Sequence, residues 1–375
     1  MKSQPVTTPV HLTATYKFSS SDDLIDVVQN RTGCIYSRWD NPSVMAAENT
    51  LAELEGYPHA LGFGSGMAAI TTAILSVVQA GDTVVATRQL YGGTFEFLND
   101  ILPALGVTTV FMDCWDTEGL LAEVEKRPRL LYLESPTNPL LRIVDIAPLT
   151  NAARRLGVVT LLDATFASPI NQRPVDLGVD GAVHSATKYL GGHHDITAGM
   201  ICCVPTLFEK IWHLRKILGG VMDPMTAFLV QRGIQTLSLR VRCQNESALA
   251  IARHLEDHPG IAAVHYPGLT SHPDHDIAVR QMSGFGGMLS FEVAADFEGT
   301  KAVMDRLKTI KLATSLGGVT SLANQPITNT HVGLSPENRD KAGVGENLVR
   351  LSVGIEPVAT LMRDLDQALE GRRPA

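Results

Sequence analysis

The chain has 375 residues, of which 45% are hydrophobic and 19% charged, and its formal net charge is -8. This length and composition are typical of a large globular protein with about two domains. The acidic balance and the lack of a basic run argue against a nucleic-acid-binding protein, and no apolar run approaches the length of a membrane span.

The cysteines are scattered along the chain. They are Cys34, Cys114, Cys202, Cys203 and Cys243. An odd number without CxxC spacing predicts neither a metal site nor a disulfide framework, and it favours a reducing compartment. The N-terminal stretch MKSQPVTTPVHLTATYKF lacks the apolar core of a signal peptide. We therefore expect a cytoplasmic protein that binds no metal and no membrane.

Residues 1–50 are poor in periodic structure and are predicted to form an extended arm. Within the arm, the motif YSRWDNPS places Tyr36 and Arg38 two positions apart. Side chains at that spacing point the same way in an extended segment, so the two could bind one phosphate together. An ordinary loop that turns at Asn41-Pro42 explains the same residues.

Helical patterns follow the arm. VMAAENTLAELEG predicts a helix stopped by Gly56, and a second helix is predicted from Ser65 as N-cap to Gly81. The second helix is preceded and opened by glycines, which are Gly62, Gly64 and Gly66. Its start is a candidate anion site. The pattern is not a dinucleotide fingerprint, because Met67 occupies the place of the third glycine, and no lysine follows where a P-loop requires one.

Five apolar runs are predicted as buried strands, at residues 83–87, 108–112, 129–134, 158–163 and 198–204. Helical patterns lie between the first four, which is typical of a parallel sheet with crossover helices. Ligands on such sheets bind at the carboxyl ends of the strands. The residues expected at those ends include Tyr91, Asn138, Asp163 and Lys188.

The stretch HSATKYLGGHHD surrounds Lys188 with small hydroxyl residues and a glycine pair, which leaves room for a bulky anion beside the ammonium. Asp163 ends the apolar run of VVTLLDATFASP. A pyridoxal phosphate site requires a lysine that forms an imine with the cofactor aldehyde and a carboxylate that keeps the ring nitrogen protonated. The alternative is that Lys188 is a surface lysine and Asp163 an ordinary acid at the end of a strand.

The pattern changes after about residue 235. Alternating stretches such as GMLSFEV and VRLSVGIE are joined to helical patterns such as SALAIARHLEDH. They predict a smaller α+β domain with an antiparallel sheet. The expected organisation is therefore an arm over residues 1–50, a large domain over 51–235 and a C-terminal domain over 236–375.

The sequence resembles the Cys/Met-metabolism family of pyridoxal-phosphate enzymes, which includes cystathionine γ-synthase, cystathionine γ- and β-lyases and methionine γ-lyase. The shared motifs occur in the family's order over nearly the whole chain: YSRWDNPS, GSGMAAI, LYGGT, ESPTNP, DATFASP, HSATKYLGG, YPGLTSHPDH, SLGGVTSL and VRLSVGIE. The resemblance implies a fold-type I α/β enzyme. Its large domain would carry a mostly parallel, seven-stranded type of sheet flanked by helices.

The resemblance also implies roles for individual residues around the cofactor. Lys188 would form the Schiff base with pyridoxal phosphate, and Asp163 would pair with the pyridinium nitrogen. Tyr91 would stack on the ring and assist as an acid or base, and Asn138 would lie near the ring hydroxyl. The phosphate would be bound by four residues, Gly66, Met67, Ser185 and Thr187.

Further roles concern the subunits and the substrate. The resemblance implies that Tyr36 and Arg38 complete the phosphate site of a neighbouring subunit, so the active unit would be a homodimer, with a homotetramer as a dimer of dimers. Ser315 and Arg350 would hold the α-carboxylate of an amino-acid substrate, a task for which the planar fork of arginine is suited.

In the implied chemistry, Lys188 moves protons after the substrate amine displaces it, and a leaving group departs from Cγ. Hydrolysis then gives a 2-oxo acid and ammonia. We expect a γ-elimination lyase of this kind, acting on a sulfur- or oxygen-linked γ-substituent. One alternative is a γ-replacement enzyme of the cystathionine γ-synthase or homoserine-ester sulfhydrylase type. Another, from a different class, is a non-catalytic α/β protein that binds a cofactor.

Three positions depart from the family's patterns. Glu96 stands where cystathionine-handling members usually have arginine, Thr320 stands where many have glutamate, and Gly93 stands where methionine γ-lyases have cysteine. An acid at position 96 would repel a distal carboxylate and attract a cation. The hypothesis is a substrate with a cationic or neutral distal group, such as canavanine. The alternative is that Glu96 points into solvent and selects nothing.

Overall fold

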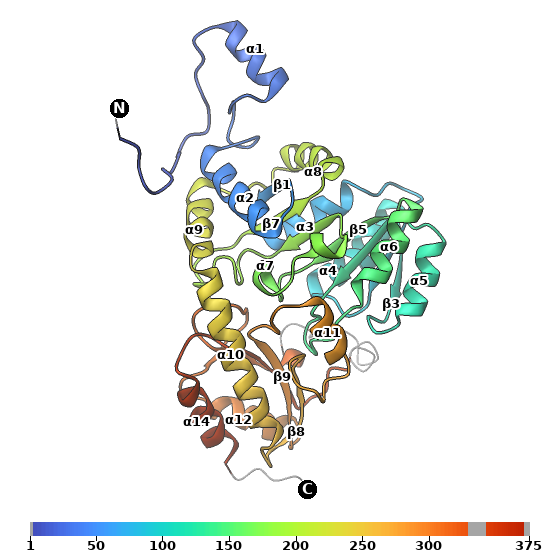
Figure 1. The fold of residues 1–375 in the computed structure, drawn as a ribbon, viewed down its shortest axis with the longest axis vertical. Coiled ribbons are helices and arrows are strands. Elements are labelled where there is room, and N and C mark those ends of the chain that lie inside the picture. The colour runs from blue at the N-terminus through green and yellow to red at the C-terminus, as the bar shows by residue number, and fades with distance from the viewer. Residues whose placement is uncertain (1–2, 329–342, 371–375) are drawn as a thin grey trace.

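The computed structural model describes residues 3–328 and 343–370 (Figure 1). A large domain is built on a seven-stranded sheet and a smaller C-terminal domain on a five-stranded sheet. The long helix α10 (Leu237–Glu256) runs from the large domain along the smaller one (Figure 1). Within the described residues, none of the helices combines the length and apolar character needed to cross a membrane.

The large sheet has the strand order β1-β7-β6-β5-β4-β2-β3. Strands β2 to β6 pair in parallel, whereas β7 is antiparallel to both of its neighbours, β1 and β6. This arrangement confirms the predicted fold-type I α/β class with a mostly parallel sheet. The strands are β1 (His59–Phe63), β2 (Thr83–Thr87), β3 (Thr108–Met112), β4 (Leu130–Glu134), β5 (Val159–Asp163), β6 (Gly181–His184) and β7 (Gly199–Cys203).

The five predicted strands match β2, β3, β4, β5 and β7 to within one residue at each end. Strands β1 and β6 were not predicted. The sequence of β6 is GAVH, too short and too poor in large apolar residues to stand out from its surroundings. Strand β1 leads directly into the glycine-rich segment, so its apolar pattern shows no clear end in the sequence.

Alternate residues of the central strands pack on opposite faces of the large sheet, as the two-residue period of a strand requires. On one face, Leu161 of β5 joins a cluster with helices α3 and α8. On the other face, Leu162 joins a cluster with α5 and α6. The helices of this domain are α2 (Pro42–Glu55), α3 (Gly66–Leu75), α4 (Gly92–Glu96), α5 (Thr117–Glu125), α6 (Ile146–Leu156), α7 (Ser168–Asn171), α8 (Pro205–Leu218) and α9 (Pro224–Ile234). Short π- and 3₁₀-helical turns occupy Phe97–Ile101, Leu102–Leu105 and Pro174–Leu177.

Helix α3 begins where the sequence predicted but ends earlier. Ser65 caps it, because its hydroxyl accepts the N–H of Ala68 at 3.1 Å. The prediction that it runs to Gly81 is wrong, since the helix ends at Leu75 and Ser76 is its C-cap. The Ser76 hydroxyl donates to the carbonyl of Ala73, one of the local side-chain bonds that compete with helix continuation.

The N-terminal arm projects from the large domain (Figure 1), but it is not extended throughout. It contains helix α1 (Ser21–Asn30), which the sequence analysis missed. Ser20 caps α1 by accepting the N–H of Asp23 at 3.0 Å, and acidic residues fill its first turn. No residue of α1 is buried in the single chain, so the helix has little of the tertiary packing that usually stabilises a short helix.

The smaller domain carries a sheet with the order β10-β11-β12-β9-β8, which is antiparallel except for the β10/β11 pair. Its strands are β8 (Ile261–His265), β9 (Met288–Val293), β10 (Lys311–Leu312), β11 (Leu322–Asn324) and β12 (Leu348–Ser352). Its helices are α10, α11 (His275–Gln281), α12 (Phe297–Arg306) and α14 (Val358–Leu369), with a 3₁₀ turn at Pro326–Thr328. The predicted α+β domain agrees with these elements, but its sheet was predicted to be antiparallel and contains one parallel pair, β10 with β11.

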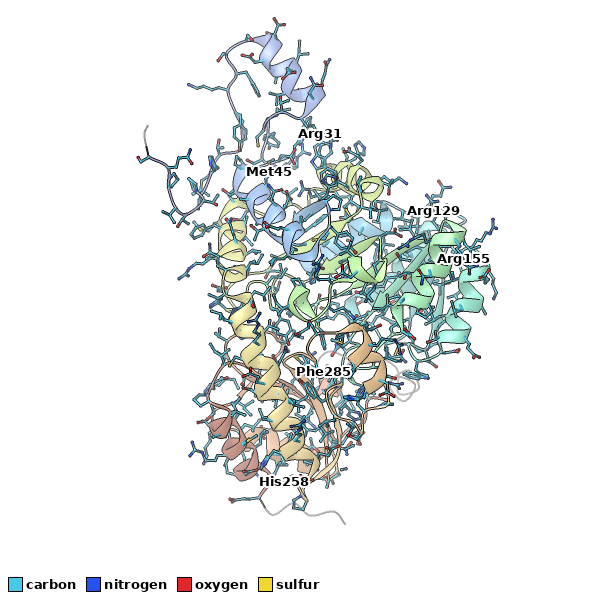
Figure 2. All side chains as sticks on the ribbon, viewed as in Figure 1. Arg31, Met45, Arg129, Arg155, His258 and Phe285 are labelled. Atoms are coloured by element: carbon cyan, nitrogen blue, oxygen red, sulfur yellow. The ribbon has the colours of Figure 1, made fainter. Side chains whose placement is uncertain are left out.

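Phe285 lies in the region where the smaller domain meets the large one (Figure 2). Polar contacts join the two domains. Arg142 of the large domain binds the carboxylate of Asp274 through two nitrogens, at 2.6 and 3.0 Å. Ser290 of β9 donates to the carbonyl of Pro139 at 2.7 Å. These bonds fix the loop that follows β4 against the smaller domain, so residues from both domains meet at one place.

Candidate active site

The carboxyl edge of the large sheet gathers four of the candidate residues. Tyr91 follows β2, Asn138 follows β4, Asp163 is the last residue of β5 and Lys188 follows β6. Strands β2, β4, β5 and β6 are consecutive neighbours in the parallel part of the sheet. The candidate residues therefore lie along one edge, where parallel sheets bind their ligands.

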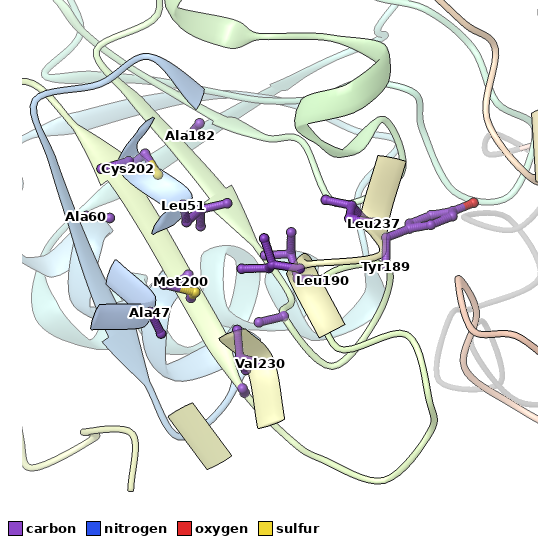
Figure 3. Close-up of a cluster of buried hydrophobic side chains, with 14 of the residues drawn as sticks. Ala47, Leu51, Ala60, Ala182, Tyr189, Leu190, Met200, Cys202, Val230 and Leu237 are labelled. Atoms are coloured by element: carbon purple, nitrogen blue, oxygen red, sulfur yellow. The ribbon is translucent and has the colours of Figure 1, made fainter. Parts of the chain in front are cut away.

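Lys188 is held by the residues that follow it. Tyr189 and Leu190 are buried in an apolar cluster beside Leu237 of α10 (Figure 3). The Lys188 amine donates to the hydroxyl of Ser315 at 2.8 Å. Burial, together with the positive charge of Arg350, lowers the pKa of the amine to about 8. A lysine in this state is neutral often enough near physiological pH to act as a nucleophile or base.

Arg350 reaches the same place from β12 of the smaller domain. One terminal nitrogen donates to the side-chain oxygen of Asn138 at 2.9 Å and the other to the carbonyl of Ser315 at 3.3 Å. The guanidinium is buried, which lowers the pKa of Arg350 to about 10. Among the described residues it has no carboxylate partner. A buried arginine without an acid suits an anionic ligand.

Asp163 is also buried, with 6% of its surface exposed. The N–H of Thr165 donates to its carboxylate at 3.0 Å. Burial raises the pKa of this carboxyl above its usual value, and in the part of the chain that the structure describes it forms no ion pair. A cationic ring nitrogen beside Asp163 would supply the missing counter-charge.

The predicted phosphate-binding residues lie at the start of α3 and in the turn before Lys188. Gly66 and Met67 are the first residues of α3, where backbone N–H groups are free to bind an anion. A methyl group on Gly66 would lie 3.0 Å from the Cβ of Ser185, so only glycine lets the two segments approach this closely. Thr187 exchanges hydrogen bonds with the backbone of Ala198, which fixes the turn.

Tyr91 lies at the N-cap of α4 and is 45% exposed in the single chain. A methyl group on Gly93 would lie 2.9 Å from the Tyr91 ring and 3.2 Å from the sulfur of Met67. Gly93 therefore allows the ring to lie close to the start of α3. Gly93 thus lies between the predicted stacking residue and Met67 of the predicted phosphate site.

Four predicted residues lie apart from this group or at its margin. Tyr36 and Arg38 are on the arm, where the Arg38 guanidinium lies 5.4 Å from the centre of the Tyr36 ring and donates to the carbonyl of Lys216. Glu96, the last residue of α4, is exposed. Thr320 follows Val319 in the sequence. The N–H of Val319 donates to the carbonyl of Gly192, in the segment that follows Lys188.

One buried acid in the site was missed by the sequence analysis. Glu134 ends β4, and its carboxylate accepts the N–H groups of Tyr91 and Asn138. The signal was its place as the first residue of ESPTNP, where only the asparagine was considered. Its position at the carboxyl end of a predicted strand should have drawn attention to it.

The residues present fit pyridoxal phosphate. A half-buried lysine, a buried acid without a counter-charge, a glycine-lined helix start and a buried arginine converge on one edge of the sheet. The lysine suits the cofactor aldehyde, and the acid suits the basic ring nitrogen. The helix start suits the phosphate, and the arginine suits the carboxylate of an amino-acid partner.

Known proteins that are similar to this chain are enzymes of cystathionine metabolism. The chain is 43% identical over 367 residues to cystathionine γ-synthase 1, chloroplastic, of Arabidopsis thaliana, covering 97% of this chain and 65% of that protein. It is 38% identical to cystathionine γ-lyase of Bacillus subtilis, covering 98% and 95% of the two chains. The chain thus spans about two-thirds of the plant protein and nearly all of the bacterial one.

Solved structures show the same fold. Cystathionine γ-synthase from Xanthomonas oryzae pv. oryzae, in complex with aminoacrylate and cysteine, superposes with a TM-score of 0.93 at 36% identity, covering 97% of this chain and 92% of that one. The family model described as Cys/Met metabolism PLP-dependent enzyme matches residues 1–370. The chain therefore belongs to the Cys/Met-metabolism family of PLP-dependent enzymes, whose cofactor is pyridoxal phosphate.

Proposed function

We propose that this protein is a γ-elimination lyase that acts on a γ-substituted L-amino acid with a sulfur- or oxygen-linked leaving group. The observation that carries the proposal is the continuous set of contacts from Lys188 through Ser315 to Arg350 and Asn138. It places a proton-transfer group next to a buried cation that suits the substrate's α-carboxylate.

The chain's own residues would hold the cofactor as follows. Asp163 would face the ring nitrogen, Tyr91 the ring plane and Asn138 the ring hydroxyl. The phosphate would be bound at the start of α3 and in the turn before Lys188, by Gly66, Met67, Ser185 and Thr187. When bound, pyridoxal phosphate supplies a ring that accepts electrons from the carbon beside the substrate amine.

The protein residues then have two tasks, which are orientation and proton transfer. Arg350 and Ser315 would fix the substrate carboxylate, so that the Cα–H bond faces the Lys188 amine. Lys188, with its pKa lowered to about 8, would take the Cα proton and return it at a later step. Tyr91, which is 45% exposed, would assist at the leaving group on Cγ as an acid or base.

Ketoacid release is the test of this proposal. We expect the purified protein with pyridoxal phosphate to convert γ-substituted amino acids into a 2-oxo acid and ammonia without an added thiol. A colourless preparation that takes up no pyridoxal phosphate would contradict the proposal and favour a non-catalytic protein.

A γ-replacement activity is the second candidate. The 43% identity to plant cystathionine γ-synthases favours it, as does the similarity to the Xanthomonas oryzae synthase. Thiol-dependent formation of a thioether from an activated homoserine ester, with little ketoacid in the absence of thiol, would identify this activity in place of elimination.

We further propose that the distal group of the substrate is cationic or neutral, because Glu96 is exposed at the end of α4, downstream of Tyr91. We expect Glu96→Arg to raise KM for a guanidinium-bearing substrate such as canavanine about tenfold, through loss of one charge-assisted hydrogen bond. Steady-state kinetics on canavanine and cystathionine measures the change. Asp100→Arg, which alters the net charge equally from the exposed turn after α4, is the control. An unchanged preference in the Glu96 variant would end this specificity proposal.

We propose a homodimer as the active unit, paired into a homotetramer, with Tyr36 and Arg38 binding the phosphate of the neighbouring subunit. The support is the arm, which projects from its own domain with apolar side chains exposed (Figure 2).

A reducing, cytoplasmic location accords with five cysteines that are all free.

Mixing inactive variants tests the shared site. We expect Arg38→Ala and Lys188→Ala to be nearly inactive alone, whereas their equimolar mixture, unfolded and refolded together, regains about a quarter of wild-type activity. Half of the dimers would then be mixed, and each would contain one intact site. A mixture as inactive as its components would show that Arg38 serves its own subunit.

A further inference from the structure

Glu134 lies at the centre of the candidate site. It is the last residue of β4, which pairs with β2 on one side and with β5 on the other. One carboxylate oxygen accepts the N–H of Tyr91 at 2.7 Å, and the other accepts the N–H of Asn138 at 3.2 Å. A single side chain therefore connects the loop after β2 with the loop after β4, and each loop carries a residue proposed to contact the cofactor ring.

The position is an unfavourable one for an acid. Glu134 is buried and stands directly opposite Asp163 in the strand register. Burial and the charge of Asp163 raise the pKa of Glu134 well above its usual value, although the two N–H groups act in the opposite direction. An acid whose pKa is raised by folding stabilises the protein fully below its unfolded pKa, and this contribution is lost as pH rises through the folded pKa. Ionisation of Glu134 in the folded protein is therefore unfavourable for stability.

Asp364 shows what a purely structural acid does in this chain. It is a buried residue of α14 that accepts the N–H groups of Lys308, Thr309 and Ile310. Those bonds lower the pKa of Asp364 despite its partial desolvation, so its contribution to stability is present above its unfolded pKa and is lost on acidification. The two acids accept the same kind of donor, but folding raises the pKa of Glu134 and lowers the pKa of Asp364.

We infer that Glu134 is a positioning residue whose carboxylate fixes Tyr91 and Asn138 relative to each other. It would thereby determine the position and tilt of the bound pyridoxal phosphate ring. This inference rests on the proposed function. The carboxylate is suited to the task because both of its oxygens accept hydrogen bonds. A glutamine accepts with one atom only, and its amide NH₂ would face the second backbone N–H. An aspartate keeps the charge but is one methylene too short to span both loops.

The test compares Glu134→Gln with Asp364→Asn, starting from the purified full chain. For Glu134→Gln we expect an unchanged or higher Tm of the cofactor-free protein at neutral pH, because a neutral amide replaces an acid whose ionisation burial and Asp163 disfavour. We expect its Kd for pyridoxal phosphate to rise at least about tenfold, through loss of a hydrogen bond to a charged group. The circular dichroism of the bound cofactor's visible band should change as well, because the ring tilts.

For Asp364→Asn we expect the reverse, with a lower Tm and unchanged cofactor Kd and visible circular dichroism. Wild-type Kd and visible circular dichroism in Glu134→Gln would overturn the inference. So would the failure of both Glu134→Gln and Glu134→Asp to fold, because the carboxylate would then serve the fold. If the wild-type chain itself bound no pyridoxal phosphate, the proposed function would fail. Equal binding by the wild-type chain and Glu134→Gln would contradict only the role of Glu134.

Discussion

A Lys188→Ala variant is expected to lose turnover by at least about a thousandfold, the scale of a removed general acid–base group. It is also expected to lose its covalent cofactor label. Lys188 is the amine at the carboxyl edge of the sheet that contacts Ser315, and burial lowers its pKa to about 8. Borohydride reduction followed by peptide mass spectrometry measures the label, which we expect on the peptide that contains Lys188.

Two further variants show whether the effect belongs to this amine. Lys188→Arg keeps the positive charge, but a guanidinium is too basic to act as a nucleophile, so it should be as inactive as the alanine variant. Lys210→Ala removes an exposed lysine from α8 and should retain full activity and label. A borohydride-stable label on another lysine, or on Lys188→Ala itself, would contradict the assignment.

The sheet could be predicted from sequence where its strands are long and apolar. Strand β4 reads LLYLE, every residue of which is buried, and its ends were placed to within one residue. Strand β6 could not be found in the same way, because glycine and alanine carry too little apolar surface for a periodic signal. Helix α1 was missed for another reason, since none of its residues is buried in the single chain.

The site residues also divide into those that the sequence predicts and those that it does not. The positions of Asp163 and Lys188 follow from the rule that parallel sheets bind ligands at their carboxyl edge. The contact of Arg350 with Asn138 joins residues of two domains, and no local pattern encodes it. Glu134 was overlooked because its function lies in two bonds to backbone groups, and such bonds leave no trace in the residue types of their partners.

An Asp163→Asn variant is expected to lower kcat about a hundred- to a thousandfold, the scale of a removed electrostatic contact at a developing charge. Asp163 is buried and forms no ion pair within the described chain, and burial raises its pKa. A cation at the ring nitrogen would be stabilised by this carboxylate and left without a counter-charge by an amide. Single-turnover kinetics of Cα-proton exchange measures the loss at the proton-transfer step.

Asp180→Asn provides the matched control. Asp180 directly precedes β6, which pairs in parallel with β5, so it lies at the opposite end of this strand pair from Asp163. Its carboxylate accepts the N–H of Thr160 at 2.8 Å and the hydroxyl of Thr160 at 2.9 Å. Its loss should lower the Tm without changing the rate of proton exchange. If Asp163→Asn changed only the Tm, as expected for Asp180→Asn, Asp163 would be a structural acid and the cofactor ring would lie elsewhere.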